Sequence, residues 1–436
     1  MLKKWNASLA LTLASAIAIS GCSQRPEAST AAPASAPSSG KETSNSSSAP
    51  KKTLSMLSNV ADQPVQEVYR QIINDFSKAN PDIAVNIQFP GSAYENNMKV
   101  KMAANDLPDV FDTHGWAQIR YGEYLQDLKE EPWAKQLTDT IKNVVTDKAG
   151  KVYALPLSEA KDGIMYNVEM LKKFNIEPPK TFDELITAAE KIKKESGGKT
   201  TPFFFSGIDE STIGTYFDYF ANSLLISPEK NSAEALLKNT FDWNNWNLLP
   251  EKLLDIKNRG LINEDFLTAK RSEIPAAFAA EKVAFVLLAP SFLDAVNKLK
   301  PEMKVGLMPI PSMSADDKPN FSGGERATMG VWKDSKNKPE SLKLLAFFAK
   351  PENMTKIANV TKLQPGLKGI ESKHDLTEYY EKYADIRVFP YFDRVYLPNG
   401  MWSVMSKSGT ELLAGRITPK EYSANMKQEV ERLRKN

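Results

Sequence analysis

Cysteine is almost absent from this chain of 436 residues, which contains only Cys22. A single cysteine excludes an intrachain disulfide and a metal site built from several thiolates. Histidine is nearly as scarce: His114 and His374 lie far apart and have no second ligand at helical spacing, so we expect no metal at either. The 56 basic side chains almost cancel the 54 acidic ones, and this balance argues against a nucleic-acid partner.

Sequence patterns of the common catalytic sites are also missing. The chain has no Gly-x-Ser-x-Gly, no His-Glu-x-x-His, no EF-hand loop and no Rossmann glycine pattern. Gly-Lys-Thr at 198–200 resembles the end of a phosphate-binding loop, but residue 193 is Lys where that loop needs Gly, which favours a solvent-exposed turn. No pair of carboxylates stands out as catalytic. We therefore expect no enzymatic activity, no cofactor and no metal.

The single cysteine ends a segment typical of a lipoprotein leader. Lys3 and Lys4 precede an apolar run over residues 7–19, and residues 19–22 read Ile-Ser-Gly-Cys. A basic start, a short apolar stretch and small residues at its end are typical of a secretory signal. The run is shorter than the roughly 20 apolar residues of a membrane span. We predict that residues 1–21 are removed and that Cys22 is lipidated; an uncleaved anchor with a buried cysteine is the alternative.

The segment after the cysteine lacks large apolar side chains. Residues 23–52 contain nine Ser, six Ala, four Pro and two Thr, and no Val, Ile, Leu, Met, Phe, Trp or Tyr. Such a composition cannot bury enough apolar surface to offset its ordering entropy, so it predicts a flexible tether. Together with Cys22 it makes residues 22–52 a leash, which places the protein on the extracytoplasmic face of the cell membrane.

Strand and helix patterns alternate in the body of the chain. The predicted order is strand, helix, strand, helix, strand, over residues 54–60, 64–79, 83–89, 94–104 and 108–111. Such alternation implies a parallel sheet with helices on its faces, and ligands bind at the carboxyl ends of its strands. The loop at 112–116, Asp-Thr-His-Gly-Trp, is therefore a candidate site. Capping boxes at 181–184 and 418–421 predict two further helix starts.

Three stretches resemble the extracellular solute-binding proteins of carbohydrate ABC importers, the family that includes the maltose-binding protein. They are residues 108–128, with Pro-Asp-Val-Phe and Leu-Gln-Asp-Leu; residues 153–185, with Tyr-Ala-Leu-Pro and Gly-Ile-Met-Tyr-Asn; and residues 321–352, with Phe-Ser-Gly-Gly. The resemblance implies an α/β, two-lobed periplasmic-binding-protein-like fold. Each lobe would be a mainly parallel sheet flanked by helices, and crossing hinge strands would join the lobes.

The resemblance also implies where the lobes begin and end. The crossings would lie near residues 158–162, 306–309 and 361–365. The N-lobe would then comprise residues 53–157 and 310–360, and the C-lobe residues 159–305 and 364–436. Hinges of this kind are a few residues at element ends that absorb a backbone rotation.

Sugar-binding side chains are expected on both lobes. A pyranose has an apolar face and a ring of hydroxyls, so its site combines aromatic rings with carboxylate, amide and guanidinium groups. The alternatives are core packing for an aromatic ring, and a salt bridge or a loop-ordering hydrogen bond for a polar group. From loop position and from the resemblance, the candidate ligand-binding residues are Trp116, Trp402, Glu159, Phe292, Asp112, His114, Gly324, Glu325, Arg326, Asp162 and Arg394.

The leader, the leash and the resemblance together predict a lipid-anchored receptor. It would capture a mono- or oligosaccharide in the cleft between its lobes and deliver it to the permease subunits of an ABC transporter. We expect a monomer. Two alternatives remain: a receptor for a non-sugar solute, and an exported carbohydrate-active enzyme, which would need two facing carboxylates at glycosidase separation.

Overall fold

The structure is a computed structural model that describes residues 52–209, 211–228 and 230–435. The described residues belong to one compact unit. The predicted leader, Cys22 and nearly all of the predicted leash lie outside the described residues. No helix of the described part is long and apolar enough to cross a membrane.

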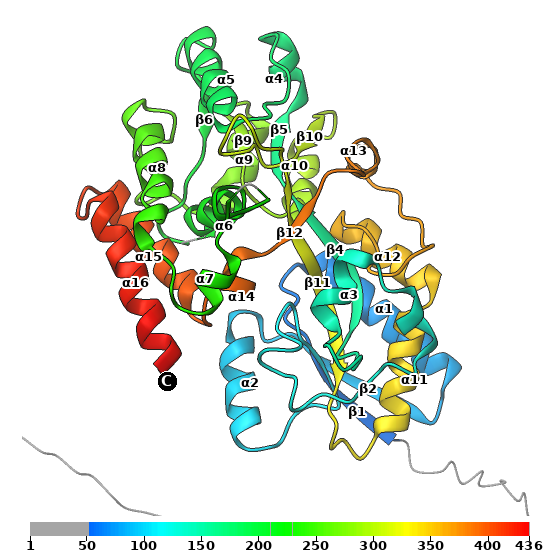
Figure 1. Ribbon diagram of the computed structural model, residues 1–436. Coiled ribbons are helices and arrows are strands. Elements are labelled where there is room, and N and C mark those ends of the chain that lie inside the picture. Colours follow the sequence, from blue (N-terminus) through cyan, green and yellow to red (C-terminus); the bar gives the residue numbers. More distant parts are fainter. Residues whose placement is uncertain (1–51, 210, 229, 436) are drawn as a thin grey trace, which may run out of the picture. The chain divides into compact units, whose positions relative to one another are not determined.

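Two sheets organise the fold. The first has six strands in the order β12-β11-β3-β1-β2, with β4 paired to β11; the second has four, in the order β10-β5-β9-β6. We call the part built on the first sheet the N-lobe and the part built on the second the C-lobe (Figure 1). The strands are β1 (Lys52–Leu57), β2 (Ile83–Gln88), β3 (Val110–Asp112), β4 (Leu155–Asp162), β5 (Ile164–Asn167), β6 (Thr201–Phe203), β7 (Ile226–Ser227), β8 (Lys230–Asn231), β9 (Val283–Val286), β10 (Val305–Met308), β11 (Phe321–Val331) and β12 (Val388–Pro390).

Helices connect and cover these strands. The two expected capping boxes are present: Thr181 and Glu184 exchange hydrogen bonds at the start of α5, and Thr418 and Glu421 do so at the start of α16. The α-helices are α1 (Gln63–Ala79), α2 (Tyr94–Ala103), α3 (Asp139–Val145), α4 (Val168–Lys173), α5 (Phe182–Glu195), α6 (Ser211–Leu225), α7 (Ala233–Leu237), α8 (Leu248–Asn258), α9 (Ile274–Ala279), α10 (Leu293–Leu299), α11 (Lys338–Phe348), α12 (Pro351–Thr361), α13 (Thr377–Lys382), α14 (Phe392–Tyr396), α15 (Met401–Leu413) and α16 (Pro419–Lys435).

The predicted order at the start of the body is confirmed. Strands β2 and β3 both pair in parallel with β1, and α1 and α2 are the connections between them. Helix α1 forms because Val65, Ile72 and Phe76 recur at helical spacing and Pro64 occupies its first turn. Its apolar face is buried against the N-lobe core, where each large side chain contributes about 1.5–3 kcal/mol.

The second sheet is less parallel than expected. Strand β5 is antiparallel to both β10 and β9, and only β6 and β9 are parallel. Strand β5 continues β4 from the other lobe after a single residue, Gly163. It alone runs opposite to β6, β9 and β10, which share one direction.

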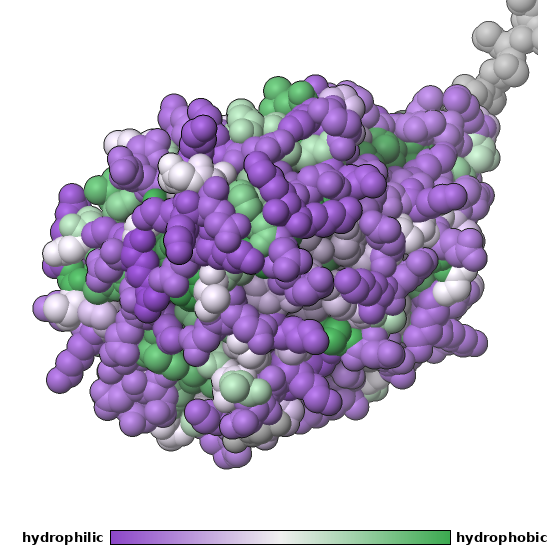
Figure 2. All heavy atoms as spheres, turned by 90° about the horizontal axis from the view of Figure 1, so that it is seen from above, coloured by the Kyte–Doolittle hydropathy of each residue, from purple (hydrophilic) through white to green (hydrophobic). Residues whose placement is uncertain are grey.

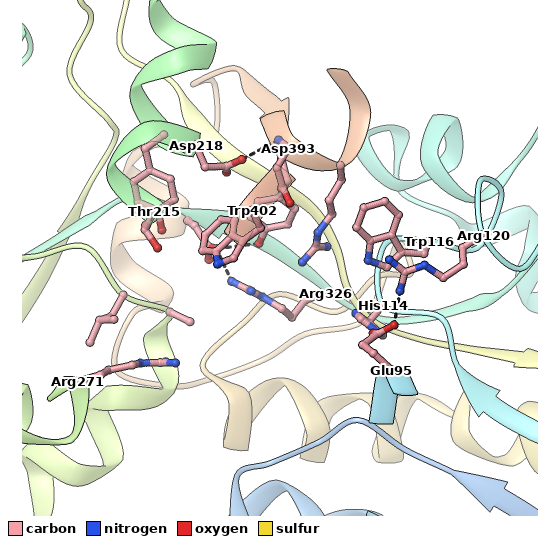
Figure 3. A pocket seen from close by; sticks show the side chains of 16 residues that line it. Glu95, His114, Trp116, Arg120, Thr215, Asp218, Arg271, Arg326, Asp393 and Trp402 are labelled. Carbon is pink, nitrogen blue, oxygen red and sulfur yellow. Dashed lines mark hydrogen bonds and ion pairs between the residues drawn. The ribbon is translucent and has the colours of Figure 1, made fainter. Parts of the chain in front are cut away.

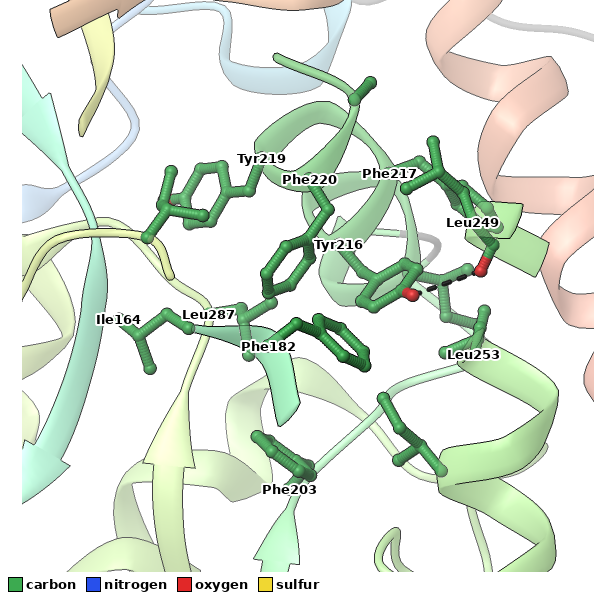
Figure 4. Packing of buried hydrophobic residues seen from close by; sticks show 14 of the residues in the cluster. Ile164, Phe182, Phe203, Tyr216, Phe217, Tyr219, Phe220, Leu249, Leu253 and Leu287 are labelled. Atoms are coloured by element: carbon green, nitrogen blue, oxygen red, sulfur yellow. Dashed lines mark hydrogen bonds between the residues drawn. The ribbon is translucent and has the colours of Figure 1, made fainter. Parts of the chain in front are cut away.

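Aromatic side chains dominate the core of the C-lobe. Figure 4 shows part of this cluster, in which Phe182 meets Phe220 edge-on with ring centroids 5.1 Å apart. The buried hydroxyl of Tyr216 donates to the carbonyl of Leu249 at 3.1 Å, so burying this ring leaves no unpaired donor. The face of the molecule seen in Figure 2 is mostly hydrophilic, with apolar side chains scattered over it.

Two long strands connect the lobes. Strands β4 and β11 pair antiparallel, from Asp162 opposite Ser322 to Leu155 opposite Met329. Strand β4 leads directly into β5 of the C-lobe, and the far end of β11 pairs with β3 of the N-lobe. The chain passes beside them a third time, where the N–H of Glu159 donates to the carbonyl of Gln364 at 2.7 Å.

The segment between β10 and β11 stays with the C-lobe. Ile310 is buried in the same cluster as Phe182, and Ser312 forms a bridge with Thr181. The chain therefore returns to the first sheet along β11, about ten residues later than the expected boundary at residue 310.

Candidate functional site

A cavity of about 460 Å³ is lined by side chains from both lobes (Figure 3). The N-lobe contributes one side chain from α2 and three from the loop after β3. The C-lobe contributes side chains from α6, α14, α15 and the loops between them, and the crossing strands β4 and β11 contribute one each. The lining residues are Glu95, His114, Trp116, Arg120, Asp162, Thr215, Asp218, Tyr219, Arg271, Leu288, Ala289, Arg326, Tyr391, Asp393, Arg394 and Trp402.

On the N-lobe side, four side chains form one connected group. Glu95 lies 2.6 Å from Nε2 of His114 and pairs through its other oxygen with Arg120. The guanidinium of Arg120 lies over the ring of Trp116, 4.3 Å from its centroid. Burial raises the pKa of Glu95, but the hydrogen bond and charge of His114 and the charge of Arg120 outweigh it and lower the pKa overall. The ion pair between Glu95 and Arg120 thus holds the group together, while burial lowers the pKa of His114 and favours a neutral imidazole beside Glu95.

Arg120 also reaches across to the C-lobe. Its Nη2 donates to Oδ1 of Asn399 at 2.6 Å, just before the start of α15. One side chain therefore holds Glu95, covers Trp116 and contacts the opposite lobe. Such a contact exists only when the lobes are close, so it favours the closed arrangement.

On the C-lobe side, two carboxyl groups lie together. The N–H of Asp393 donates to Oδ1 of Asp218 at 2.9 Å, and the hydroxyl of Ser322 is 3.4 Å from the other oxygen of Asp218. Burial raises the pKa of Asp218 well above its usual range, and the neighbouring charge of Asp393 raises it further. Burial also raises the pKa of Asp393, against the charge of Arg394. The pair can thus offer both donors and acceptors to hydroxyl groups.

The crossing strands supply a second charged cluster. The carboxylate of Asp162 on β4 pairs with Arg326 on β11 and accepts the hydroxyl of Tyr391 at 2.7 Å. The guanidinium of Arg326 is 5.2 Å from the ring centroid of Tyr391. These groups line the cavity where the lobes are joined, so a ligand that contacts them contacts the hinge strands themselves.

Trp402, at the first turn of α15, is the tryptophan that the C-lobe contributes to the lining. Its ring lies against α6, because a Cβ added at Gly214 would be 2.9 Å from its Cζ2 and 3.0 Å from its Cε2. The ring is half-buried and also lines the cavity. The cavity therefore has one tryptophan from each lobe, and both stand among charged groups.

Six of the residues predicted from the sequence line this cavity. They are His114, Trp116, Asp162, Arg326, Arg394 and Trp402. The guanidinium of Arg394 lies over the ring of Tyr391, 4.2 Å from its centroid, and contacts the backbone of Gly115 in the N-lobe loop.

The other five predicted residues do not line it. Asp112 is buried beside β1 and accepts from the hydroxyl of Ser58 at 2.5 Å and from the N–H of Asn59 at 2.9 Å. Glu159 accepts from the hydroxyl of Thr138 at 2.7 Å and is buried at the crossing. Both carboxylates thus make internal bonds between segments of the N-lobe and the hinge.

The remaining three lie near the crossing or in neighbouring cavities. Glu325 is buried on β11. Gly324 lines a separate cavity of about 440 Å³. Phe292 packs edge-on against Phe278, with centroids 5.6 Å apart, and lines a third cavity of about 510 Å³.

Sequence reasoning missed several lining residues, some of which carry a signal. Asp218 is the only charged residue of α6, a helix that is otherwise apolar or neutral, and a lone charge in such a helix needs a specific partner or ligand. Arg120 follows Trp116 by four residues in a loop already singled out, and Asp393 adjoins Arg394. Glu95 and Arg271 have no comparable feature in the neighbouring sequence. Nothing near them in the chain indicates that Glu95 faces the loop after β3 or that Arg271 faces α6.

No group of three or more His, Cys, Asp or Glu side chains within the described ranges is placed to hold a metal ion. The cavity's polar groups are instead carboxyl, guanidinium, imidazole and phenol groups beside two indole rings. Such a set suits an uncharged ligand that carries many hydroxyls and an apolar face.

The chain matches known proteins over most of its length. Residues 62–355 match the model of the family described as bacterial extracellular solute-binding protein. The melibiose/raffinose/stachyose-binding protein MelE of Bacillus subtilis is 41% identical over 385 residues, which cover 88% of this chain and 90% of that protein. These matches are to binding proteins and not to enzymes.

Solved structures give the same result. A sugar transporter from Bacillus licheniformis in complex with stachyose is 45% identical, with a TM-score of 0.81 over 87% of this chain and all of that chain. A binding protein from Bacillus subtilis in an open conformation is 41% identical, with a TM-score of 0.85 over 88% of this chain and 98% of that one. The expected two-lobed fold and family are thereby confirmed: this chain belongs to the bacterial extracellular solute-binding proteins.

Proposed function

We propose that this protein is the receptor for galactose-containing oligosaccharides of the melibiose, raffinose and stachyose series. It captures the sugar in the cavity between its lobes and delivers it to an ABC-type permease. The observation that carries the proposal is the cavity itself, with a tryptophan from each lobe among paired carboxyl and guanidinium groups. The relatives that are 41% and 45% identical, one named for these sugars and one solved with stachyose, support the ligand class.

Each part of the cavity has a role in this proposal. The ring of Trp402 packs against the apolar face of a hexose, since an indole is flat and polarisable. Asp218 and Asp393 bind hydroxyls, as donors where a carboxyl holds its proton and as acceptors where it does not. Arg326 and Arg394 donate to hydroxyl or ring oxygens. Trp116 and His114 contact the sugar from the N-lobe.

Closure follows from contacts that require both lobes. A ligand held by Trp402 alone forms no new contacts when the lobes approach. A ligand that also meets Trp116 and Arg120 forms additional contacts in the closed state. Only such a difference in contacts between open and closed states shifts the equilibrium. The paired strands β4 and β11 are where we place the hinge, with the passage at Gln364 beside them.

Isothermal titration calorimetry of the purified protein tests the ligand class. We expect binding of melibiose, raffinose and stachyose with micromolar dissociation constants, and at least about a hundredfold weaker binding of maltotriose, a difference of about 2.7 kcal/mol. Absence of heat with all three galactosides would overturn the proposal and favour a receptor for another solute. Release of galactose from raffinose by the purified protein would instead favour the enzyme alternative.

We further propose that the mature chain begins at a lipidated Cys22 and acts as a monomer tethered to the cell membrane. The leader pattern and the Ser-, Ala- and Pro-rich composition of the following segment support this. Substitution of Cys22→Ser should release the protein from the membrane fraction while its sugar affinity stays unchanged. Retention of the variant on the membrane would contradict the anchor.

A further inference from the structure

A second chamber adjoins the central cavity. It has a volume of about 510 Å³ and shares Arg271 and Leu288 with the central cavity. We propose that the central cavity binds the non-reducing galactosyl end that all members of the series share, and that this chamber binds the additional hexose units of a tri- or tetrasaccharide, which then extend in one direction. The inference rests on the proposed function and adds to it the direction in which a longer ligand extends.

The chamber, like the central cavity, is lined from both lobes. Asp62 comes from the N-lobe, at the start of α1, and Lys270 and Ser291 come from the C-lobe. Asp62 occupies the N-cap position, but its side chain makes no capping hydrogen bond. Its exposed carboxylate is therefore not committed to the helix and can accept hydroxyl groups.

The C-lobe wall of the chamber is built by a local network. The carboxylate of Asp209 accepts the N–H of Arg271 and the hydroxyl of Ser206, the latter at 3.0 Å. This network fixes the backbone at the boundary between the two cavities. The side chains of Lys270 and Arg271 are exposed there, as a hydroxyl-rich ligand requires.

Phe292, a predicted sugar platform, lines this chamber and not the central cavity. Its ring is 7% exposed and packs edge-on against Phe278, so a ligand reaches only its rim. Recognition in the chamber therefore depends mainly on Asp62, Lys270 and Ser291, with the aromatic ring as an apolar wall.

Extension into the other cavity that adjoins the central one is obstructed. The cavity of about 440 Å³ shares Arg394 with the central one, and the Arg394 guanidinium lies directly against Gly115, where even a Cβ would overlap it. Its walls include the apolar side chains of Val144, Val388 and Val395. Arg271, at the other boundary, is exposed instead of wedged between the lobes. The geometry thus favours extension toward Asp62 and Lys270.

Calorimetry with sugars of increasing length tests the direction. Asp62→Ala, Lys270→Ala and the double variant are titrated with melibiose, raffinose and stachyose. We expect the double variant to lose roughly tenfold or more in affinity for stachyose, the loss of one or two hydrogen bonds to charged groups. Affinity for the shortest sugar that binds should change less than about twofold, because neither side chain lines the central cavity.

Asn143→Ala, in the obstructed cavity, is the matched control and should leave the affinities for all three sugars unchanged. An equal loss for short and long sugars, an undiminished stachyose affinity, or a selective stachyose loss in Asn143→Ala would each overturn the inference. Thermal unfolding of the unliganded variants, with Asp62→Asn as a second substitution, separates misfolding from lost contacts. Failure of the proposed function looks different, because the unmodified protein would then bind none of the sugars.

Discussion

The two sides of the central cavity differ in how their charged groups are paired. On the N-lobe side, Glu95 is satisfied by His114 and Arg120, and Arg120 in turn covers Trp116. On the C-lobe side, Asp218 and Asp393 are like charges held together, and burial raises the pKa of each. The first group is organised around an ion pair between Glu95 and Arg120, whereas in the second burial favours a protonated carboxyl, which can donate to and accept from ligand hydroxyls. We infer that the C-lobe provides most of the affinity and that the N-lobe closes over the bound sugar.

Removing the Trp402 side chain should cause the largest loss of sugar affinity and so tests the contribution of the C-lobe side most strongly. Trp402→Ala takes away the aromatic ring that we propose as the sugar platform of the C-lobe, and we expect about a hundredfold loss of raffinose affinity, in the range of an aromatic hot spot. Lys407→Ala, an exposed position on the same helix, is the control and should bind normally. An affinity within threefold of the unmodified protein, roughly 0.65 kcal/mol, would show that Trp402 is not the platform.

Displacing the Trp402 ring should cause the next largest loss of sugar affinity. Gly214→Ala crowds the Ser406 hydroxyl and the Trp402 ring, and we expect displacement of the ring to cost about a tenfold loss of affinity, or 1.4 kcal/mol. Gly409→Ala is the matched control: it crowds Ile213 and Phe217 at the same α6–α15 contact without touching Trp402. Both variants should unfold at a lower temperature, but only Gly214→Ala should bind weakly. Equal losses of affinity would mean that the helix contact, and not the ring, is responsible.

Trp116→Ala probes the N-lobe side, and here we expect a smaller loss of about fivefold. One face of Trp116 already meets Arg120, so less of the ring is available to the sugar. Ile119→Ala, exposed in the same loop and outside the central cavity, should bind as the unmodified protein does. Calorimetry of the Trp116 and Trp402 variants compares how much each lobe contributes to sugar affinity. A larger loss of affinity for Trp116→Ala would show that the N-lobe side contributes more.

Glu325, which is buried on the crossing strand β11 and does not line the central cavity, should affect stability more than binding. Burial raises the pKa of Glu325 to about 7, and the charge of Arg394 opposes the shift. Because the folded state holds this proton more tightly, the contribution to the free energy of unfolding is full below about pH 4.5 and is lost as the pH rises through 7. Glu325→Gln should therefore flatten this pH dependence by at most about 3 kcal/mol between pH 4.5 and 8.

Urea unfolding at several pH values measures this slope. Burial also raises the pKa of Asp112 to about 7, against hydrogen bonds from Ser58 and Asn59, so its contribution has the same sign. The Asp112 contribution remains in Glu325→Gln, and Asp112→Asn should remove a further part of the pH dependence. An unchanged slope in both variants would show that neither carboxyl is protonated in the folded state near neutral pH.

Local signals explain why the N-lobe side was the easier one to predict. Its strands and helices alternate within about sixty residues, and the loop after β3 follows from the rule that ligands lie at strand ends. Trp116 and His114 were accessible to that reasoning, and Arg120 lies only four residues further on. Glu95 was not, because only the packing of α2 against the loop brings it there.

The C-lobe side depends on long-range packing that periodicity does not reveal. Asp218 and Asp393 are 175 residues apart and meet only because α14 packs beside α6. The resemblance to a known family placed Trp402 at the cavity, but it also suggested Glu159 and Phe292, which the structure places at the hinge and in the second chamber. The sequence pattern did not reveal that β5, which continues β4 from the other lobe, runs opposite to the other three strands of the second sheet.

A crystal structure of this protein with raffinose tests the central claim most directly. We predict one hexose ring packed against Trp402, hydroxyls within hydrogen-bonding distance of Asp218 or Asp393, and Trp116 approaching from the other lobe. A sugar bound in a different cavity, or in this one without contact to Trp402 and the carboxyl pair, would contradict the account.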